Sequence, residues 1–208
     1  MSITFYYAPR SSASRIRWSL AELDVPHEAV RLDLGAGDQK KPEFLALNPN
    51  GKVPTIVIDG TPMFEAIAIQ IALGERYGVE KGLWPALGSP EHLQALTWLL
   101  WGQVTFAAVL YRYMMNTSEW TPKEQHNAAQ AESAMTEVHN LLRILDARLT
   151  GRAYVTGESF TLTDLDLAAM LGWGLMVAKV DVSPYANVQA WLGRIQERPI
   201  ARTILAEG

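Results

Sequence analysis

The residues best placed to do chemistry lie in the stretch Asn48–Ala66, NPNGKVPTIVIDGTPMFEA. Its Asn-Pro and Asn-Gly pairs favour turns, and Pro54 opens a strand without donating to the ladder. If the Val53–Pro54 bond is cis, Val53 can offer its backbone N–H and C=O to an extended peptide. Glu65 opens the next expected helix, where a charged ligand end can be held. The stretch therefore predicts a binding site for a small peptide.

A second group of reactive side chains lies near the N-terminus. Ser11, Ser12 and Ser14 fall at the start of the first expected helix, and Tyr6 ends the strand before it. Serine commonly serves there only as a helix cap. A hydroxyl at a helix N-terminus can also stabilise a thiolate, by hydrogen bonding and through the helix dipole. The chain has no cysteine, so any reacting thiol must come from a ligand.

Composition narrows the class of protein. The 208 residues are 49% hydrophobic and 19% charged, which is typical of a soluble globular protein that can bury its own core. The net charge of -4 argues against nucleic acid or anionic membrane as a partner, and four scattered histidines argue against a zinc site. We expect no signal peptide and no membrane span, because Gln, Arg or Gly interrupts each apolar passage well before about 18 residues.

Residues 1–77 alternate strand and helix. Ile3, Phe5 and Tyr7 recur at the period of a strand, and an amphipathic helix follows and ends before Pro26. The further elements expected are a strand at 28–34, a short helix or turn at 42–47, a hairpin of 55–58 with 62–64, and a helix at 65–77.

Beyond Ser89 the pattern is wholly helical. The first helix is expected at 91–116, and the second runs from a capping box at 121–124 to near 151. A third is expected to begin after Thr161. A fourth begins at 183 and is ended by Arg198-Pro199, which a terminal turn follows. Thr161 and Asp164 form a second capping-box pattern, so we predict that Asp164 is structural and not catalytic. The predicted domains are an α/β unit at 1–78, a linker rich in Gly and Pro at 79–89, and a helical bundle at 90–208.

Four motifs, in this order and spacing, resemble those of the cytosolic glutathione transferases, and the resemblance covers the entire chain. NPNGKVPT resembles the family's segment around its cis-proline, YYAPRSSASRIR the strand-turn-helix with its catalytic residue, FTLTDLDLA its buried helix cap, and RPIARTILAEG its closing segment. The resemblance implies a thioredoxin-like α/β N-terminal domain, an all-α C-terminal bundle and a cytoplasmic homodimer. It also implies detoxification by attack of the glutathione thiol on a small apolar electrophile, with glutathione as co-substrate and no metal.

The resemblance leaves open which hydroxyl lowers the thiol pKa of bound glutathione. In the preferred alignment, with serine-type enzymes of the family, Ser11 is the activating residue and Arg15 matches their arginine. Alignment with the cysteine-type bacterial enzymes puts Ser12 at the position of their cysteine. Alignment with the tyrosine-type enzymes makes Tyr6 the activating residue, and activation by backbone groups alone also remains open.

The resemblance also assigns the contacts with glutathione. Val53 would pair through its backbone with the cysteinyl part while Pro54 fixes the strand, and Glu65 would meet the γ-glutamyl ammonium. Lys52 and Gln39 match positions near the glycyl end, where the charge of Lys52 suits a carboxylate. Both residue types are also common on the surface of a protein, where they need contact only solvent.

One departure from the family concerns the residue after the acid. The family usually has serine there, which binds the γ-glutamyl carboxylate, and this chain has Ala66. The lost hydroxyl contact corresponds to about 1 kcal/mol if nothing replaces it. Arg10, beside the site, is the candidate to replace it.

The second substrate would lie against an aromatic-rich helix. The candidate pocket residues are Val104, Ala108, Tyr111 and Met115, with Trp173 opposite, although an aromatic stripe at helical spacing is more often core.

Two other functions remain open. One is a glutathione-dependent isomerase of the maleylacetoacetate type, whose loop has a comparable SSCS run but an extra residue before its arginine. The other is a non-catalytic glutathione-binding or regulatory module of the same fold, which the presence of Ala66 weakly favours.

Overall fold

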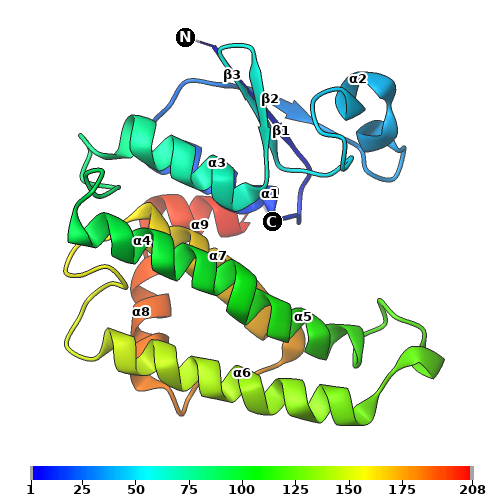
Figure 1. Ribbon diagram of the computed structural model, residues 1–208, viewed down its shortest axis with the longest axis vertical. Helices are drawn as coiled ribbons and strands as arrows, with labels where there is room; N and C mark the ends of the chain where they lie inside the picture. Colours follow the sequence, from blue (N-terminus) through cyan, green and yellow to red (C-terminus); the bar gives the residue numbers. More distant parts are fainter. Residues whose placement is uncertain (1, 207–208) are drawn as a thin grey trace. The chain divides into compact units, whose positions relative to one another are not determined.

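The computed structural model describes residues 2–206 (Figure 1). Contacts divide the chain into two compact units. One unit extends to Ser89 and includes the segment from Glu197 onward, and the other is Pro90–Gln196. The predicted linker 79–89 thus belongs to the first unit, as does the end of the predicted helical domain. Residue 1, at the start of the first predicted domain, and residues 207 and 208, at the end of the second, lie outside the described residues.

A four-stranded mixed sheet of order β2-β1-β3-β4 forms the centre of the first unit. The strands are β1 (Ile3–Tyr7), β2 (Glu28–Arg31), β3 (Thr55–Ile58) and β4 (Thr61–Phe64). β1 runs parallel to β2 and antiparallel to β3, and β3 forms the predicted hairpin with β4. Ile3 and Phe5 of β1 and Ile56 and Ile58 of β3 are buried, and Val57 between the two isoleucines is half-buried, in keeping with the apolar alternation in β1 and the apolar run in β3.

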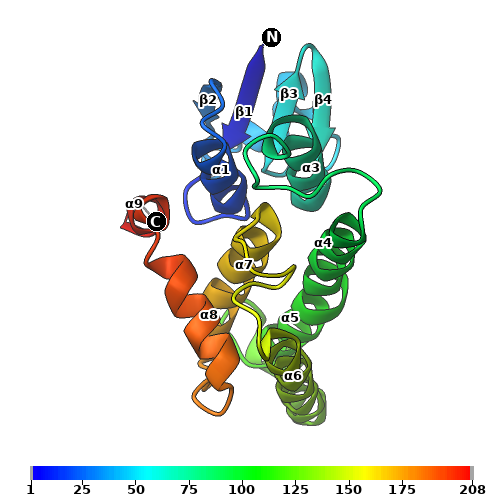
Figure 2. The same cartoon turned by 90° about the vertical axis from the view of Figure 1, so that its left-hand side faces the viewer.

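Helices cover both faces of this sheet. α1 (Ala13–Glu22) and α3 (Ala66–Leu73) pack side by side on one face, and α3 continues as a π-helical turn, η2 (Gly74–Gly78) (Figure 2). A short 3₁₀ turn, η1 (Asp38–Lys40), leads into α2 (Pro42–Leu45) on the other face (Figure 1). This arrangement is the predicted thioredoxin-like α/β architecture.

The chain ends in a helix that packs on α1. α9 (Pro199–Ala206) is preceded by Arg198, which pairs with the buried carboxylate of Glu22 through two hydrogen bonds of 3.0 and 2.6 Å. The sequence predicted only a terminal turn here, and that prediction was wrong. Proline at the first helical position lacks only an N–H that would be unpaired there anyway, so Pro199 both ends the preceding helix and starts this one.

The second unit is wholly helical, as predicted. α4 (Pro90–Leu100) continues through a π-helical segment, η3 (Trp101–Phe106), into α5 (Ala107–Met115). The unit is completed by α6 (Ala128–Leu149), α7 (Leu162–Ala178) and α8 (Ala186–Gln196). α7 contacts α4, α5 and α8, and its first seven residues are all buried, so it is the central helix of the bundle.

The start of α6 differs from the sequence prediction. The capping-box pattern at 121–124 produces only a 3₁₀ turn, η4 (Lys123–Gln125), and α6 begins at Ala128. The backbone is extended at His126 and at Asn127, and the side chain of Asn127 accepts a hydrogen bond of 3.0 Å from the N–H of Gln130. Asparagine is a strong N-cap residue, and here it, rather than Thr121, caps the long helix.

Among the described residues, one continuous helical run, Pro90–Met115, has the length and composition of a membrane-crossing helix. It passes this test although Gly102 and Gln103 interrupt it, because hydropathy is averaged over the window. A core helix of a bundle passes the same test, and 33% of the apolar window is buried inside the structure. The contacts of α4 and α5 with α7 place this run in such a bundle.

Asp164 lies at the start of α7 and is 0% exposed. Its Oδ2 accepts hydrogen bonds from the N–H and the hydroxyl of Thr161, both 3.0 Å, in the predicted capping box. Its Oδ1 accepts from the N–H of Val155 (2.7 Å) and from Nε1 of Trp191 (3.0 Å). Burial raises the pKa of this carboxyl, and the four hydrogen bonds act in the opposite direction. One side chain therefore joins α7, α8 and the loop before α7.

We predict that Asp164→Ala lowers the free energy of unfolding by about 3 kcal/mol or more, because several buried donors lose their acceptor together. Urea unfolding followed by circular dichroism measures the loss. Asp181→Ala is the control, since Asp181 is an exposed carboxylate whose hydrogen bonds within residues 2–206 go to neighbouring Ser183, and we expect less than about 1 kcal/mol there. Equal losses in the two variants would contradict the structural role of Asp164.

Candidate functional site

The candidate site is organised by one rung across the sheet. Thr55 in β3 pairs with Tyr6 in β1 and with Phe64 in β4. Each of the three strands is joined at this rung to a segment of the candidate site. β1 is followed by the loop that carries Ser11 and Ser12 (the serine loop), β3 is preceded by Val53-Pro54, and β4 is followed by Glu65. Segments far apart in the sequence thus meet at one end of the central strands.

The serine loop places its two leading hydroxyls differently. The Ser11 hydroxyl donates to the carbonyl of Ala8 (2.7 Å) and accepts from the N–H of Ala13 (3.2 Å), so it stabilises the turn before α1. The Ser12 hydroxyl is exposed and donates to the carbonyl of Val53 at 3.3 Å. Ser12 is also the N-cap residue of α1, and its side chain makes no capping hydrogen bond. The hydroxyl of Ser12 therefore faces the segment that was predicted to bind a peptide.

Val53 and Pro54 have the backbone geometry that the sequence suggested. The peptide bond between them is cis. Val53 is half-buried and precedes the first rung of the ladder at Thr55, so its backbone lies at the end of a central strand and outside the sheet pairing. An extended peptide could pair with it there.

Glu65 stands at the start of α3 in an uncommon backbone conformation. Its φ is 70° and its ψ is 113°, outside the region that residues with a side chain normally occupy. Its side chain is exposed, whereas Ala66, the first residue of α3, is buried. Strained residues of this kind cluster at ligand sites, where the surrounding structure holds them. The N-terminus of α3 beside Glu65 suits a ligand end with both charges, a carboxylate at the helix and an ammonium at the acid.

Gln39 and Lys52 lie on neighbouring loops. Gln39 Nε2 donates to the carbonyl of Leu34 (3.2 Å), while its buried Oε1 has no hydrogen-bond partner within residues 2–206. Lys52 is exposed. Arg10, which comes shortly after β1, is also exposed and has a φ of 53°. Beside Gln39, the hydrogen bond from Lys41 lowers the pKa of Asp38 and fixes the 3₁₀ turn. This part of the molecule therefore offers a buried acceptor without a hydrogen-bond partner among residues 2–206, Gln39 Oε1, and exposed positive charge on Lys52 and Arg10.

The five candidate residues for a second substrate all lie in the second unit. Val104, Ala108 and Tyr111 are exposed along η3 and α5, and Met115 is half-buried. Trp173, on α7, is also exposed and stacks on Trp120 with a centroid distance of 5.8 Å and an interplanar angle of 14°.

One contact links α5 with α7, and another links the end of α5 with the turn that follows it. Gly174 of α7 leaves no room for a Cβ beside Leu110 of α5. Thr121, next to Trp120, donates a hydrogen bond to Met115 Sδ (3.5 Å). Met115, Trp120 and Trp173 therefore lie at one end of this unit. Trp120 was missed in the sequence, because it lies in a turn and not in an apolar stripe.

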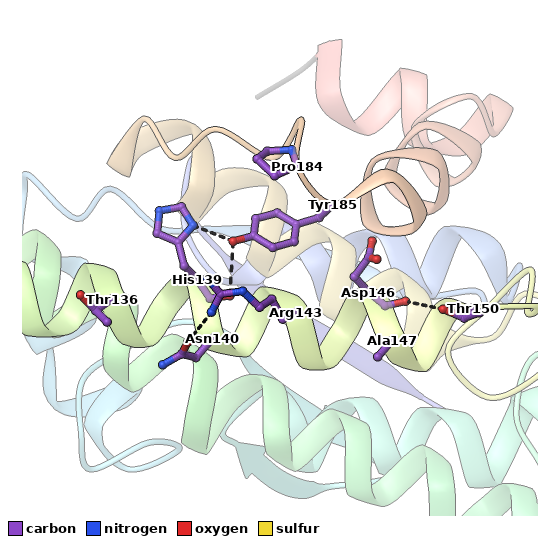
Figure 3. Close-up of a pocket in the computed structure, with 9 residues that line it drawn as sticks. All are labelled: Thr136, His139, Asn140, Arg143, Asp146, Ala147, Thr150, Pro184 and Tyr185. Atoms are coloured by element: carbon purple, nitrogen blue, oxygen red, sulfur yellow. Dashed lines mark hydrogen bonds between the residues drawn. The ribbon is translucent and has the colours of Figure 1, made fainter.

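A hollow of about 810 Å³ lies between α6 and the segment before α8, and none of the predicted site residues lines it (Figure 3). Its polar groups are largely bonded to neighbouring protein atoms. His139 Nδ1 lies 2.8 Å from the Tyr185 hydroxyl, and Asp146 accepts hydrogen bonds from the N–H groups of Asn187 and Val188 at the start of α8. These contacts attach α8 to α6. No group of three His, Asp or Glu side chains that could hold a metal ion occurs within residues 2–206.

Comparison with known protein families shows to which family the chain belongs. Residues 1–71 match the model of the glutathione S-transferase N-terminal domain, and residues 93–199 match that of the C-terminal domain. The chain belongs to the glutathione S-transferase family. The resemblance predicted from the four motifs is therefore confirmed.

Individual relatives cover nearly the whole chain. It is 29% identical over 207 residues to the disulfide-bond oxidoreductase YfcG of Escherichia coli K12, covering 95% of this chain and 91% of that protein. It is 28% identical over 198 residues to the glutathione S-transferase GstB of the same strain, covering 94% and 93%. A glutathione S-transferase from a sphingomonad, solved in complex with glutathione, superposes with a TM-score of 0.81 at 27% identity, covering 98% and 97%.

Proposed function

We propose that this protein binds reduced glutathione and transfers it, as the thiolate, to a small apolar electrophile. The observation that carries the proposal is the position of the Ser12 hydroxyl, 3.3 Å from the carbonyl of Val53 beside a cis proline. The sphingomonad relative, which was solved with glutathione, and the transferase GstB support it. The protein would act in the cytoplasm, in keeping with the family.

Glutathione would be held by groups at the rung of Tyr6, Thr55 and Phe64. The backbone of Val53 would pair with the cysteinyl residue. Glu65 and the N-terminus of α3 would receive the γ-glutamyl ammonium and carboxylate, with Arg10 near the position left by the missing serine hydroxyl. Lys52 and Gln39 would receive the glycyl end. Each assignment matches a charge or donor of the ligand with a complementary group.

The chemical step begins with loss of the thiol proton. A free thiol has a pKa of about 8.5, so most of it is protonated at neutral pH and a poor nucleophile. A hydroxyl that donates to sulfur, together with the positive end of the α1 dipole, favours the thiolate. The proton leaves to solvent, the sulfur forms a bond with the electrophilic carbon, and the electron pair departs with the leaving group or remains on the adduct.

We propose Ser12 as the donor in place of Ser11, the residue preferred from sequence alignment. The Ser11 proton is committed to the Ala8 carbonyl at 2.7 Å, and its oxygen accepts from Ala13. The Ser12 proton is directed to Val53, the residue that would pair with the cysteinyl backbone. Rotation about one bond would turn it from the Val53 carbonyl to an adjacent sulfur. Tyr6 is the further alternative, and its ring packs edge-on against Phe44.

We predict that glutathione bound to the native protein has a thiol pKa at least about one unit below that of free glutathione, and that Ser12→Ala raises it by about one unit. The sign follows because loss of a donor destabilises the thiolate and not the thiol. Thiolate absorbance of the complex against pH measures the shift. Ser11→Ala and Tyr6→Phe are the controls. A shift in Ser11→Ala with a native curve for Ser12→Ala would return the role to Ser11.

A second candidate function is glutathione-dependent reduction of disulfides. It is favoured by the 29% identity with the disulfide-bond oxidoreductase YfcG, about equal to the identity with GstB. Because the chain has no cysteine, glutathione must supply both reducing thiols. One thiolate attacks the substrate disulfide and releases a thiol, and a second glutathione attacks the mixed disulfide. The products are oxidised glutathione and two substrate thiols.

We predict that the protein conjugates glutathione to an activated chloroarene, and that Ser12→Ala slows conjugation about tenfold. The same preparation is assayed for reduction of hydroxyethyl disulfide, with oxidised glutathione as the measured product. Turnover of the disulfide alone would favour the second function. Binding of glutathione by calorimetry without either turnover would favour a non-catalytic module, and no saturable binding at millimolar glutathione would contradict the proposal as a whole.

We also propose a homodimer, which rests mainly on the family. The apolar side chains of Leu93 and Leu100 on α4 are exposed, and large exposed apolar surfaces commonly mark protein contacts. These leucines, seven residues apart, lie on one face of the helix.

Sedimentation equilibrium at micromolar concentration should give twice the 23.1 kDa mass of the chain. We predict that Leu93→Lys with Leu100→Lys shifts the protein toward monomer, because charged side chains in an apolar contact are costly. Leu87→Lys is the matched control, since Leu87 is more exposed than Leu93 (79% against 60%) but lies in the loop before α4. A native protein that sediments as a monomer would contradict the dimer.

A further inference from the structure

Asn48 is a polar residue buried beside the candidate site, with 2% of its surface exposed. Its amide Nδ2 donates to the carbonyl of Lys52 (2.8 Å) and to the hydroxyl of Thr55 (3.0 Å). Its Oδ1 accepts from the N–H of Asn50 (3.0 Å). The sequence identifies Asn48 only as a turn former. The structure shows three side-chain hydrogen bonds, two of them to residues that flank Val53-Pro54.

The carbonyl of Lys52 is the point at which this network converges. It accepts from Asn48 Nδ2 and also from the Thr55 hydroxyl at 3.1 Å. The Lys52 carbonyl belongs to the same peptide unit as the N–H of Val53. Fixing the carbonyl therefore fixes the direction of that N–H, one of the two groups proposed to pair with the cysteinyl backbone of glutathione.

The turn that carries Lys52 is also packed against the loop of Gln39. Gly51 has a φ of +59°, and a Cβ at this position would lie 2.8 Å from the carbonyl oxygen of Gln39. The N–H of Gly51 donates to the carbonyl of Asn48 (2.9 Å). The Asn48 network thus holds Lys52 in a fixed relation to both Val53 and Gln39, the groups assigned to the cysteinyl and glycyl parts of the ligand.

We infer that Asn48 and Thr55 are positioning residues for glutathione: together they orient the Lys52–Val53 peptide unit that receives the cysteinyl backbone. The inference rests on the proposed function, because the ligand is the one proposed there. Neither side chain needs to touch the ligand, since Thr55 is fully buried and Asn48 nearly so. A purely structural role would instead make their loss affect stability alone.

Four variants separate positioning from stability. Asn48→Ala and Thr55→Val remove the two donors to the Lys52 carbonyl, and Thr55→Ser keeps the hydroxyl. Ser19→Ala is the matched control, because Ser19 is equally buried in the first unit and bonds to Gln70 (2.7 Å) in the core between α1 and α3. Calorimetry with reduced glutathione, steady-state kinetics and thermal unfolding are measured on all four full-length proteins.

We expect Asn48→Ala and Thr55→Val to raise the Kd and the KM for glutathione about tenfold, while kcat changes much less. Thr55→Ser should restore native affinity. Ser19→Ala should lower the melting temperature yet bind glutathione as the native protein does. If Asn48→Ala loses stability but retains the native Kd, the positioning role is overturned.

Amide hydrogen exchange in the absence of ligand keeps this inference separate from the proposed function. Asn48→Ala should accelerate exchange in residues 50–53, with native exchange in α3. Unchanged exchange in 50–53 would overturn positioning whether or not glutathione binds. If the native protein binds no glutathione but exchange in 50–53 accelerates in Asn48→Ala, the proposed function fails, whereas the role of Asn48 in fixing this peptide unit stands.

Discussion

The pairing of Thr55 with Tyr6 and Phe64 is the constraint on which the candidate site depends. Antiparallel pairing on both sides of β3 brings the end of β1 and the end of β4 to the start of β3. Ser12, Val53 and Glu65 follow or precede this rung within a few residues, so their approximate positions are set by register. A slip of one residue would turn every side chain of a strand to the opposite face and separate these groups. The buried apolar residues of β1 and β3 oppose such a slip, and the core thus maintains the site.

The sequence predicted those parts of the fold that depend on local patterns. The alternation of β1, the hairpin that joins β3 to β4 and the Thr161–Asp164 cap each lie within a few residues, and each is present in the structure. The errors arose where two local signals competed. Position 121 satisfied a capping pattern, but Asn127 provides the cap of α6, and Pro199 was interpreted only as the end of one helix although it also starts another.

The sequence named candidate site residues, whose roles stay predictions, but local patterns did not predict how these residues are arranged in space. The motifs around Val53 and Ser11 identified the segments, because family motifs are local. Which serine faces Val53 depends on a contact across 41 residues of sequence, and local alignment offered Ser11 and Ser12 as alternatives. The part played by Asn48 was not predicted for a related reason. An asparagine before proline has a sufficient explanation as a turn former, and its bonds to Lys52 and Thr55 appear only when the turn is folded against β3.

The two candidate functions share the first chemical step and differ in the second reactant. Both require a glutathione thiolate held at Val53, so substitutions at Ser12 or Asn48 should affect both activities alike. An electrophilic carbon yields a stable thioether that only has to leave. A disulfide yields a mixed disulfide that a second glutathione must reach, because the chain has no cysteine to resolve it. The choice between the functions therefore depends on whether a second glutathione can approach the bound sulfur, and the groups that fix the first glutathione do not determine that.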